Sequence, residues 1–216
     1  MKQILILAKK DILLEFRGKE ITFSVLIFAI LALIIFNFSL GSEDIKRLAP
    51  GILWAIFSFA GILHMDHTFA PEKADDTLEG LRTCPIAPEA IYFSKVLSGF
   101  FFMFAIEIIT FIIFSILFNL NVLIPQIFLI SLLATIGFVS AGTLFAAIAL
   151  NTRAQELVLP LLFLPTATPL IIAAVTTTTE ALSGKPLGVS WLGIMLAFDI
   201  LFLAVSYIVF EYAIEE

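Results

Sequence analysis

The stretch ITFSVLIFAILALIIFNFSL, residues 21–40, is twenty residues long and contains no charged side chain. An α-helix rises about 1.5 Å per residue, so this stretch can cross the roughly 30 Å hydrocarbon core of a bilayer. The whole chain has the same character, with 61% hydrophobic and 14% charged residues among 216 and a mean hydropathy of +1.10. This composition excludes a soluble domain and indicates a polytopic membrane protein.

Five more apolar segments follow along the chain. Two of them are uncharged, one is short, one carries Glu107 and one carries Asp199. Because unpaired backbone groups are not tolerated in lipid and no alternating barrel pattern is present, all six segments are expected to be helices. The predicted fold is therefore all-α, in a single membrane domain over residues 1–216. The expected spans are about 21–40, 48–66, 96–118, 122–150, 157–179 and 187–209.

The distribution of Lys and Arg predicts the orientation, because acidic residues contribute little to the positive-inside rule. With both termini in the cytoplasm, three basic residues lie outside: Lys46, Arg47 and Lys185. Nine lie inside, namely Lys2, Lys9, Lys10, Arg17, Lys19, Lys73, Arg82, Lys95 and Arg153. We therefore expect a multi-pass protein of the inner (plasma) membrane with both termini cytoplasmic.

The N-terminal residues 1–20 predict an interfacial helix that lies along the inner leaflet before the first span. One side of the helical wheel is made of apolar residues: Met1, Ile4, Leu5, Ala8, Ile12 and Phe16. The opposite side is imperfectly polar, because it includes Ile6 and Leu13. The alternative is a plain basic flank. The apolar run is too short for an export signal.

The polar loop between the second and third spans, residues 71–92, contains a helix-start signal. Asp76 is followed three residues later by Glu79, which is the Asp form of a capping box, and Pro85 stops the helix. Such a helix is only about two turns long and would be marginal alone in water. Something is therefore expected to pack on it.

The surface of this short helix is apolar on one edge. Leu78 and Leu81 share that edge, while Arg82 stays in water. Two partners are open from the residues alone. The helix could pack on its own membrane domain or on lipid headgroups, or it could bind a cytoplasmic protein.

Two carboxylates lie within predicted spans, Glu107 and Asp199. A charged carboxylate in the middle of a span costs about 2.5 to 3.5 kcal/mol, so both should face protein. They could form a proton relay or a polar lining of a conformational switch. The alternative is a protonated carboxyl that hydrogen bonds across helices, for instance to Thr110, Ser115 or a serine elsewhere.

Two histidines stand at the end of the second span, in the sequence HMDHTF, residues 64–69. His64 and His67 are three residues apart, so they are candidates for metal or axial haem ligation. The alternative is packing at the membrane edge, where polar side chains reach water.

Prolines interrupt the fifth span at Pro160, Pro165 and Pro169. Each removes a backbone donor and clashes with the preceding turn, so the segment cannot be a straight helix. We expect it to be buried against other spans and to be a helix break with a gating role; the alternative is a kinked helix with no moving part. In the fourth span, small residues at three- and four-residue spacing predict close helix packing: Ala134, Gly137, Ala141, Gly142 and Ala146.

Three motifs together resemble one family. They are RLAPGILW at 47–54, DDTLEGLRTCPIAP at 75–88 and FLPTATPLIIAA at 163–174. Their pattern is similar to that of the haem exporter B subunit (CcmB) family of cytochrome c maturation, a branch of the ABC-2-type permeases. The resemblance implies that the polar loop is a coupling helix in a groove of an ATP-binding subunit. The implied contact and framing residues are Asp76, Leu78, Glu79, Leu81, Arg82 and Pro85.

The chain contains no GxxxxGK[ST] phosphate loop. ATP hydrolysis is therefore expected on a separate ATP-binding cassette subunit, and this chain is expected to be a permease subunit rather than an enzyme. The resemblance further implies a pair of permease subunits, haem-handling membrane proteins and a haem chaperone. Haem is the candidate substrate. The driven step could be the movement of haem across the membrane or only the release of the haem-loaded chaperone. We expect surrounding lipid, and neither a nucleic-acid partner nor a metal or cofactor held by this chain.

Two rival functions remain from the residues. An ABC-2-type exporter of another substrate would share the coupling loop. A proton-coupled secondary transporter would use Glu107 or Asp199 and would function without an ATP-binding subunit.

Overall fold

A computed structural model describes residues 2–18, 20–69, 87–150, 152 and 155–215. Within this part of the chain the regular secondary structure is helix, without strands. The described helices are α1 (Lys2–Gly18), α2 (Glu20–Ser39), α3 (Ser42–Asp66), α6 (Pro88–Phe118), α7 (Pro125–Ala149), α8 (Gln155–Leu182) and α9 (Val189–Glu215).

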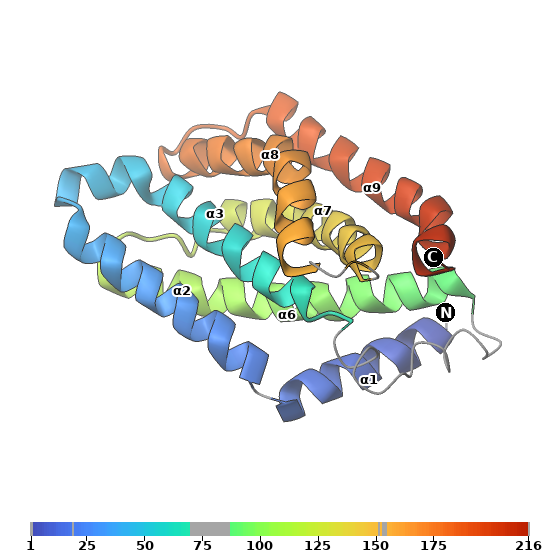
Figure 1. The fold of residues 1–216 in the computed structure, drawn as a ribbon. Helices are drawn as coiled ribbons and strands as arrows, with labels where there is room; N and C mark the ends of the chain where they lie inside the picture. The colour runs from blue at the N-terminus through green and yellow to red at the C-terminus, as the bar shows by residue number, and fades with distance from the viewer. Residues whose placement is uncertain (1, 19, 70–86, 151, 153–154, 216) are drawn as a thin grey trace.

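Six of the described helices, all except α1, are long and apolar enough to cross a membrane. This result confirms the predicted all-α polytopic fold. Figure 1 shows the helices gathered into one bundle, in which α2 packs against α3 and α6. The chain is an integral membrane protein.

The centre of the bundle is formed by α3 and α7. In each of them 72% of the candidate span is buried by the rest of the protein, against 17% in α2 and in α9. α7 packs against α9, α8, α6 and α3. Its small residues are all buried, as their spacing predicted: Ala134, Gly137, Ala141, Gly142 and Ala146. Most groups that α7 presents therefore face another helix rather than lipid.

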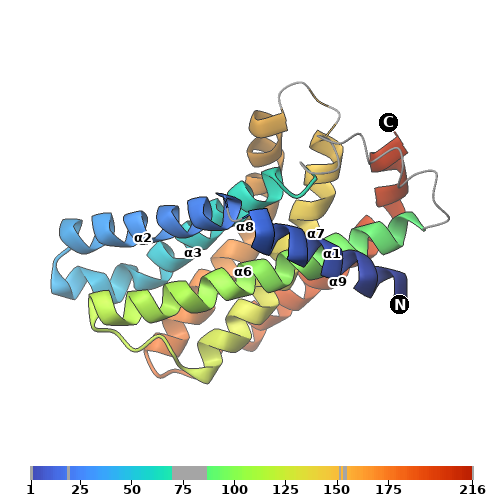
Figure 2. The ribbon, with the colours of Figure 1, turned by 90° about the horizontal axis from the view of Figure 1, so that it is seen from below.

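The N-terminal helix α1 lies beside the part of α6 that follows Pro88, as both views show (Figures 1 and 2). The predicted helix is present, and one side of it packs on the protein. Ala8 is 2% exposed, whereas Leu5 is 60% exposed and Ile6 is 68% exposed. The reason is that acidic residues of α1 face the protein.

The polar loop ends earlier than predicted, because α6 begins at Pro88 rather than near residue 96. Proline fits the first turn of a helix, where its missing N–H would have no partner in any case. The early turns are also packed: Tyr92 is fully buried, and its hydroxyl donates to the Ser140 carbonyl at 3.1 Å. Residues 88–92 therefore belong to the third membrane helix and not to the loop.

The helix α8 continues past the predicted end at residue 179, to Leu182. Threonine hydroxyls in its last turns donate to carbonyls four residues earlier, for example Thr177 to Ala173 at 2.7 Å. The chain turns away after the helix at Gly184, whose φ of +67° lies in the left-handed region that favours glycine. The Lys185 amide then donates to the Glu180 carbonyl at 3.0 Å, which is the closing bond of a Schellman motif.

Candidate functional site

The residues predicted to contact an ATPase lie outside the described residues. They are Asp76, Leu78, Glu79, Leu81, Arg82 and Pro85, and they fall in segment 70–86. The described chain stops at Phe69, three residues after the end of α3, and resumes at Ala87, one residue before α6. The structure describes the residues around these two helix ends.

A lysine at the start of α6 links three elements. Lys95 is 4% exposed, and its Nζ donates to the Thr68 carbonyl at 2.9 Å. The same Nζ lies 3.4 Å from Asp11 Oδ1 on α1 and 5.3 Å from the centre of the Phe69 ring. Lys10 also contacts this Asp11 oxygen, at 3.0 Å. The buried ammonium is therefore surrounded by a carboxylate, a carbonyl and a ring face.

A histidine in the last turn of α3 makes the second contact with α1. His64 is 5% exposed, and its Nδ1 lies 3.0 Å from Glu15 Oε1. Its ring stacks on that of Phe102 with 4.1 Å between the centres. Asp11 and Glu15 are four residues apart, so they project from one face of α1. We name Asp11, Glu15, His64 and Lys95 the ionic cluster.

The two histidines of the predicted ligand pair have different surroundings. His64 is buried in the ionic cluster, whereas His67 is exposed and its Nδ1 lies 3.0 Å from the Leu63 carbonyl. The described part of the chain contains no group of three or more His, Cys, Asp or Glu residues that could hold a metal ion. The His64 ring is stacked on Phe102, and its Nδ1 is buried beside Glu15 without a well-aligned hydrogen bond among the described residues.

The carboxylate of Glu107 is fully hydrogen-bonded in the middle of the bundle. Glu107 is 1% exposed, so it faces protein, as its cost in lipid predicts. Ser131 Oγ donates to Oε2 at 2.6 Å, and Thr135 Oγ1 donates to Oε1 at 2.7 Å. Both donors are on α7, one turn apart, so they present two hydroxyls to one carboxylate. Of the partners suggested by the sequence, a serine elsewhere in the chain is found, in Ser131, whereas Thr110 donates to the Ile106 carbonyl at 2.8 Å.

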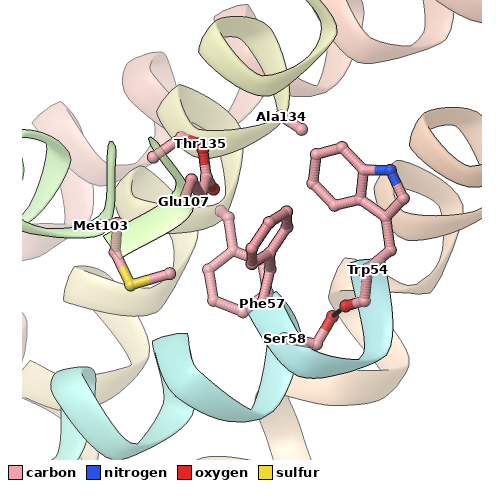
Figure 3. A pocket seen from close by; sticks show the side chains of 8 residues that line it. Trp54, Phe57, Ser58, Met103, Glu107, Ala134 and Thr135 are labelled. Atoms are coloured by element: carbon pink, nitrogen blue, oxygen red, sulfur yellow. Dashed lines mark hydrogen bonds between the residues drawn. The ribbon is translucent and has the colours of Figure 1, made fainter. Parts of the chain in front are cut away.

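A small pocket lies beside Glu107. Its volume is about 10 Å³, which is room for about one water molecule. Figure 3 shows Glu107 and Thr135 close together on one side, with Trp54 and Ser58 on the other. The Trp54 Nε1 donates to Thr178 Oγ1 on α8 at 2.9 Å, so the indole fixes α3 to α8 next to the pocket. The pocket is too small for a haem or any other large ligand.

The second carboxylate, Asp199, is 4% exposed and lies against α7 at Gly137. A Cβ added to Gly137 would lie 2.3 Å from Asp199 Oδ1, so only glycine leaves room for the carboxylate at this position. In the described part of the chain, Oδ1 of Asp199 has no hydrogen-bond partner. Glu107 and Asp199 thus meet different residues of the same helix, and the structure does not bring them into one hydrogen-bonded group.

The three prolines of the fifth span lie within one helix, α8. Figure 1 shows that α8 is bent along its length, in agreement with the expected departure from a straight helix. The expected burial of this segment is not found, because Pro165 and Pro169 are exposed and Pro160 is partly exposed. Only one side of α8 packs on the bundle, through Ala167, Leu170 and Ala173. A gating role of the prolines stays a prediction.

The sequence analysis missed the ionic cluster. Asp11 and Glu15 were not singled out, and Lys95 was counted only as a basic residue of the orientation rule. One signal was available, since two acids four residues apart interrupt an N-terminal segment that is otherwise basic. The partners on α3 and α6 could not be inferred from spacing along the chain.

Comparison with known proteins identifies the family. The family model described as CcmB protein matches residues 2–216. Heme exporter protein B of Rhodobacter capsulatus is 30% identical over 146 residues, which make up 66% of this chain and 66% of that protein. Heme exporter protein B of Pseudomonas aeruginosa is 26% identical over 185 residues, or 84% of this chain and 82% of that protein.

A third relative, Heme exporter protein B of Paracoccus denitrificans, is 30% identical over 138 residues, or 62% of this chain and 63% of that protein. The match to the first relative spans about two thirds of its length. The family model spans nearly the whole chain and therefore includes all seven described helices. On this evidence, the chain belongs to the CcmB family.

Proposed function

We propose that this chain is the membrane permease subunit of an ATP-driven haem exporter that acts in the maturation of c-type cytochromes. The observation that supports the proposal most strongly is the family match over residues 2–216. The relatives are named Heme exporter protein B, and the six candidate membrane helices suit a permease. ATP hydrolysis is assigned to a separate subunit, because this sequence has no phosphate loop.

In this proposal the protein lies in the inner membrane with both termini in the cytoplasm, as the distribution of Lys and Arg predicts. Segment 70–86 is then cytoplasmic and binds the ATP-binding subunit through Leu78, Glu79, Leu81 and Arg82. Two copies of the permease work with two ATP-binding subunits. Haem-handling membrane proteins and a haem chaperone complete the pathway, and the driven step is haem transfer or release of the loaded chaperone.

The environment of Glu107 favours this function over a proton-driven carrier. Two hydroxyls on α7 occupy both of its oxygens, and no ion pair involves Glu107 in the described residues. This arrangement serves helix packing. Asp199, on α9, meets α7 elsewhere, at Gly137, so the two carboxylates form no continuous relay within the described structure.

The proposal is tested by coexpressing tagged protein with its genomic neighbours and purifying it in detergent. We expect a phosphate-loop ATPase to copurify with the wild type, and to be lost or uncoupled in Leu81→Glu. The matched control is Leu123→Glu, which places the same charge in the connection between α6 and α7. Leu123 is 41% exposed and lies beyond the far end of the 31-residue helix α6.

Two results would contradict the proposal. In the first, no ATPase copurifies with the wild-type protein. In the second, Leu81→Glu binds and activates the ATPase as well as Leu123→Glu does. Either result would remove the coupling role of segment 70–86, and substitutions of Glu107 and Asp199 would become the next test.

A further inference from the structure

The N-terminal helix α1 turns its acidic residues toward the protein. Ala8, Asp11 and Glu15 are spaced by three and four residues and therefore lie on one face. Ala8 is 2% exposed, and the side chains of Asp11 and Glu15 are 11% and 17% exposed. Large apolar residues lie on the uncovered side of the helix: Leu5, Ile6, Leu13 and Leu14.

This arrangement is more than membrane anchoring requires. A helix that only lies in the interface turns its apolar face to lipid and its charged face to water. In α1 the apolar side chains are free to contact lipid, but the acids are directed at His64 of α3 and Lys95 of α6. Buried charges are tolerated only when they are paired and hydrogen-bonded. The contacts to His64 and Lys95 therefore fix where α1 lies.

The ionic cluster holds both helix ends that flank segment 70–86. His64 is in the last turn of α3, and Lys95 bonds to the carbonyl of Thr68, just beyond that helix. Lys95 itself is on α6, two turns after Pro88. Through Asp11 and Glu15, α1 contacts both ends at once. α1 is also followed closely by α2, which begins at Glu20.

We propose that Asp11, Glu15, His64 and Lys95 are positioning residues for the coupling step. They hold α1, the end of α3 and the start of α6 together as one body. A displacement of segment 70–86 is then passed to α6 and α2, instead of being lost by a separation of α3 from α6. This inference rests on the proposed function, in which segment 70–86 receives the movement of the ATPase.

The test compares two kinds of substitution in the complex with its ATPase. The mild variants neutralise one acidic residue, and the exchanged variants reverse the charges of Asp11 and Lys95. The mild variants are Asp11→Asn and Glu15→Gln, which keep size and hydrogen-bonding atoms. The exchanged set is Asp11→Lys, Lys95→Asp and the double variant that contains both. The matched control is Lys9→Glu, because Lys9 is an exposed residue of the same helix. Two quantities are measured for each variant: ATP hydrolysis by the purified complex and holo-cytochrome c formed per complex in cells.

We expect the mild variants to assemble with the ATPase and to hydrolyse ATP, while cytochrome formed per ATP hydrolysed falls by about fivefold or more, in the range of measured couplings between sites. The single reversals should lower this ratio further, and the double exchange should recover part of it. Lys9→Glu should behave like the wild type. Recovery in the double variant ties the effect to the Asp11–Lys95 contact.

A merely structural role gives a different result. If the variants reduce only the amount of assembled complex, and the output per ATP stays at the wild-type value, the inference is wrong. Failure of the proposed function is recognised with the wild-type protein. In that case the wild-type protein is purified without a bound ATPase. That result would overturn this inference as well, since no coupling step would remain for the ionic cluster to position.

Discussion

Asp11 and Glu15 meet Lys95 of α6 and His64 at the end of α3, whereas Glu107 and Asp199 meet hydroxyls and a glycine along α7. The first region is built from opposite charges, and the second contains no cation among the described contacts. A charge costs most at the centre of a bilayer and less near its edge. The comparison indicates that the protein places an ion pair, Asp11 with Lys95, beside segment 70–86 and uses neutral hydroxyl donors at Glu107 in the interior.

The largest effect is expected when the charge of the buried Lys95 is reversed, because this substitution should destabilise the ionic cluster most strongly. Lys95→Glu places a carboxylate against Asp11, and loss of one partner of a buried pair costs about 3–5 kcal/mol. We expect this loss in the free energy of unfolding, measured by denaturant titration in detergent. Lys185→Glu is the control, because Lys185 is an exposed cation in the α8–α9 connection. Equal stability of the two variants would show that the ionic cluster is not needed for folding.

A smaller effect is expected where Asp199 contacts α7. In Gly137→Ala the new Cβ would also lie 3.0 Å from Phe198 and 3.1 Å from Leu170, so the helices must separate, at a cost of about 1–3 kcal/mol. The control is Gly193→Ala, where a Cβ meets nothing within 4 Å. We expect that control to be neutral or to gain about 0.5–1 kcal/mol in unfolding free energy from helix propensity.

The double variant Gly137→Ala with Asp199→Ala sharpens this test. Removal of the carboxylate should recover part of the lost stability, because the shortest contact of the new methyl is then gone. If Gly137→Ala is as stable as the wild type, α7 and α9 do not approach each other as closely as described.

The smallest effect is expected at Glu107. A variant at this position tests whether the interior region needs a charge there. Glu107→Gln keeps an acceptor for one hydroxyl, and interhelical hydrogen bonds in membranes contribute about 0.6 kcal/mol on average. We expect a loss of about 1 kcal/mol or less, and cytochrome formation near the wild-type level. Loss of transport by a stably folded Gln variant would instead support the proton-driven carrier.

The membrane helices could be predicted from the sequence because each one is an apolar run of sufficient length. The ends were less predictable, since tertiary contacts decide them. α6 begins at Pro88 because the following turns pack, with Tyr92 buried and Lys95 paired. α8 continues through four threonines because their hydroxyls bond to its own carbonyls or, for Thr178, accept from Trp54.

The ionic cluster shows what the sequence alone could not provide. Its members stand at positions 11, 15, 64 and 95, and each by itself resembles an ordinary charge at the membrane edge. Only the packing of α1 on α6 brings them together. The burial of Glu107 was predictable from the cost of a charge in lipid, but its donors, Ser131 and Thr135, depend on which face α7 turns to α6.

The bond between Trp54 and Thr178 provides an optical reporter inside the bundle. The chain has two tryptophans, so Trp191→Phe leaves a single indole, which joins α3 to α8 and borders the pocket of Glu107. Its fluorescence emission depends on the polarity around the ring and on the N–H bond. A red shift during ATP turnover would reveal water entering between these helices, without a chemical label on the protein.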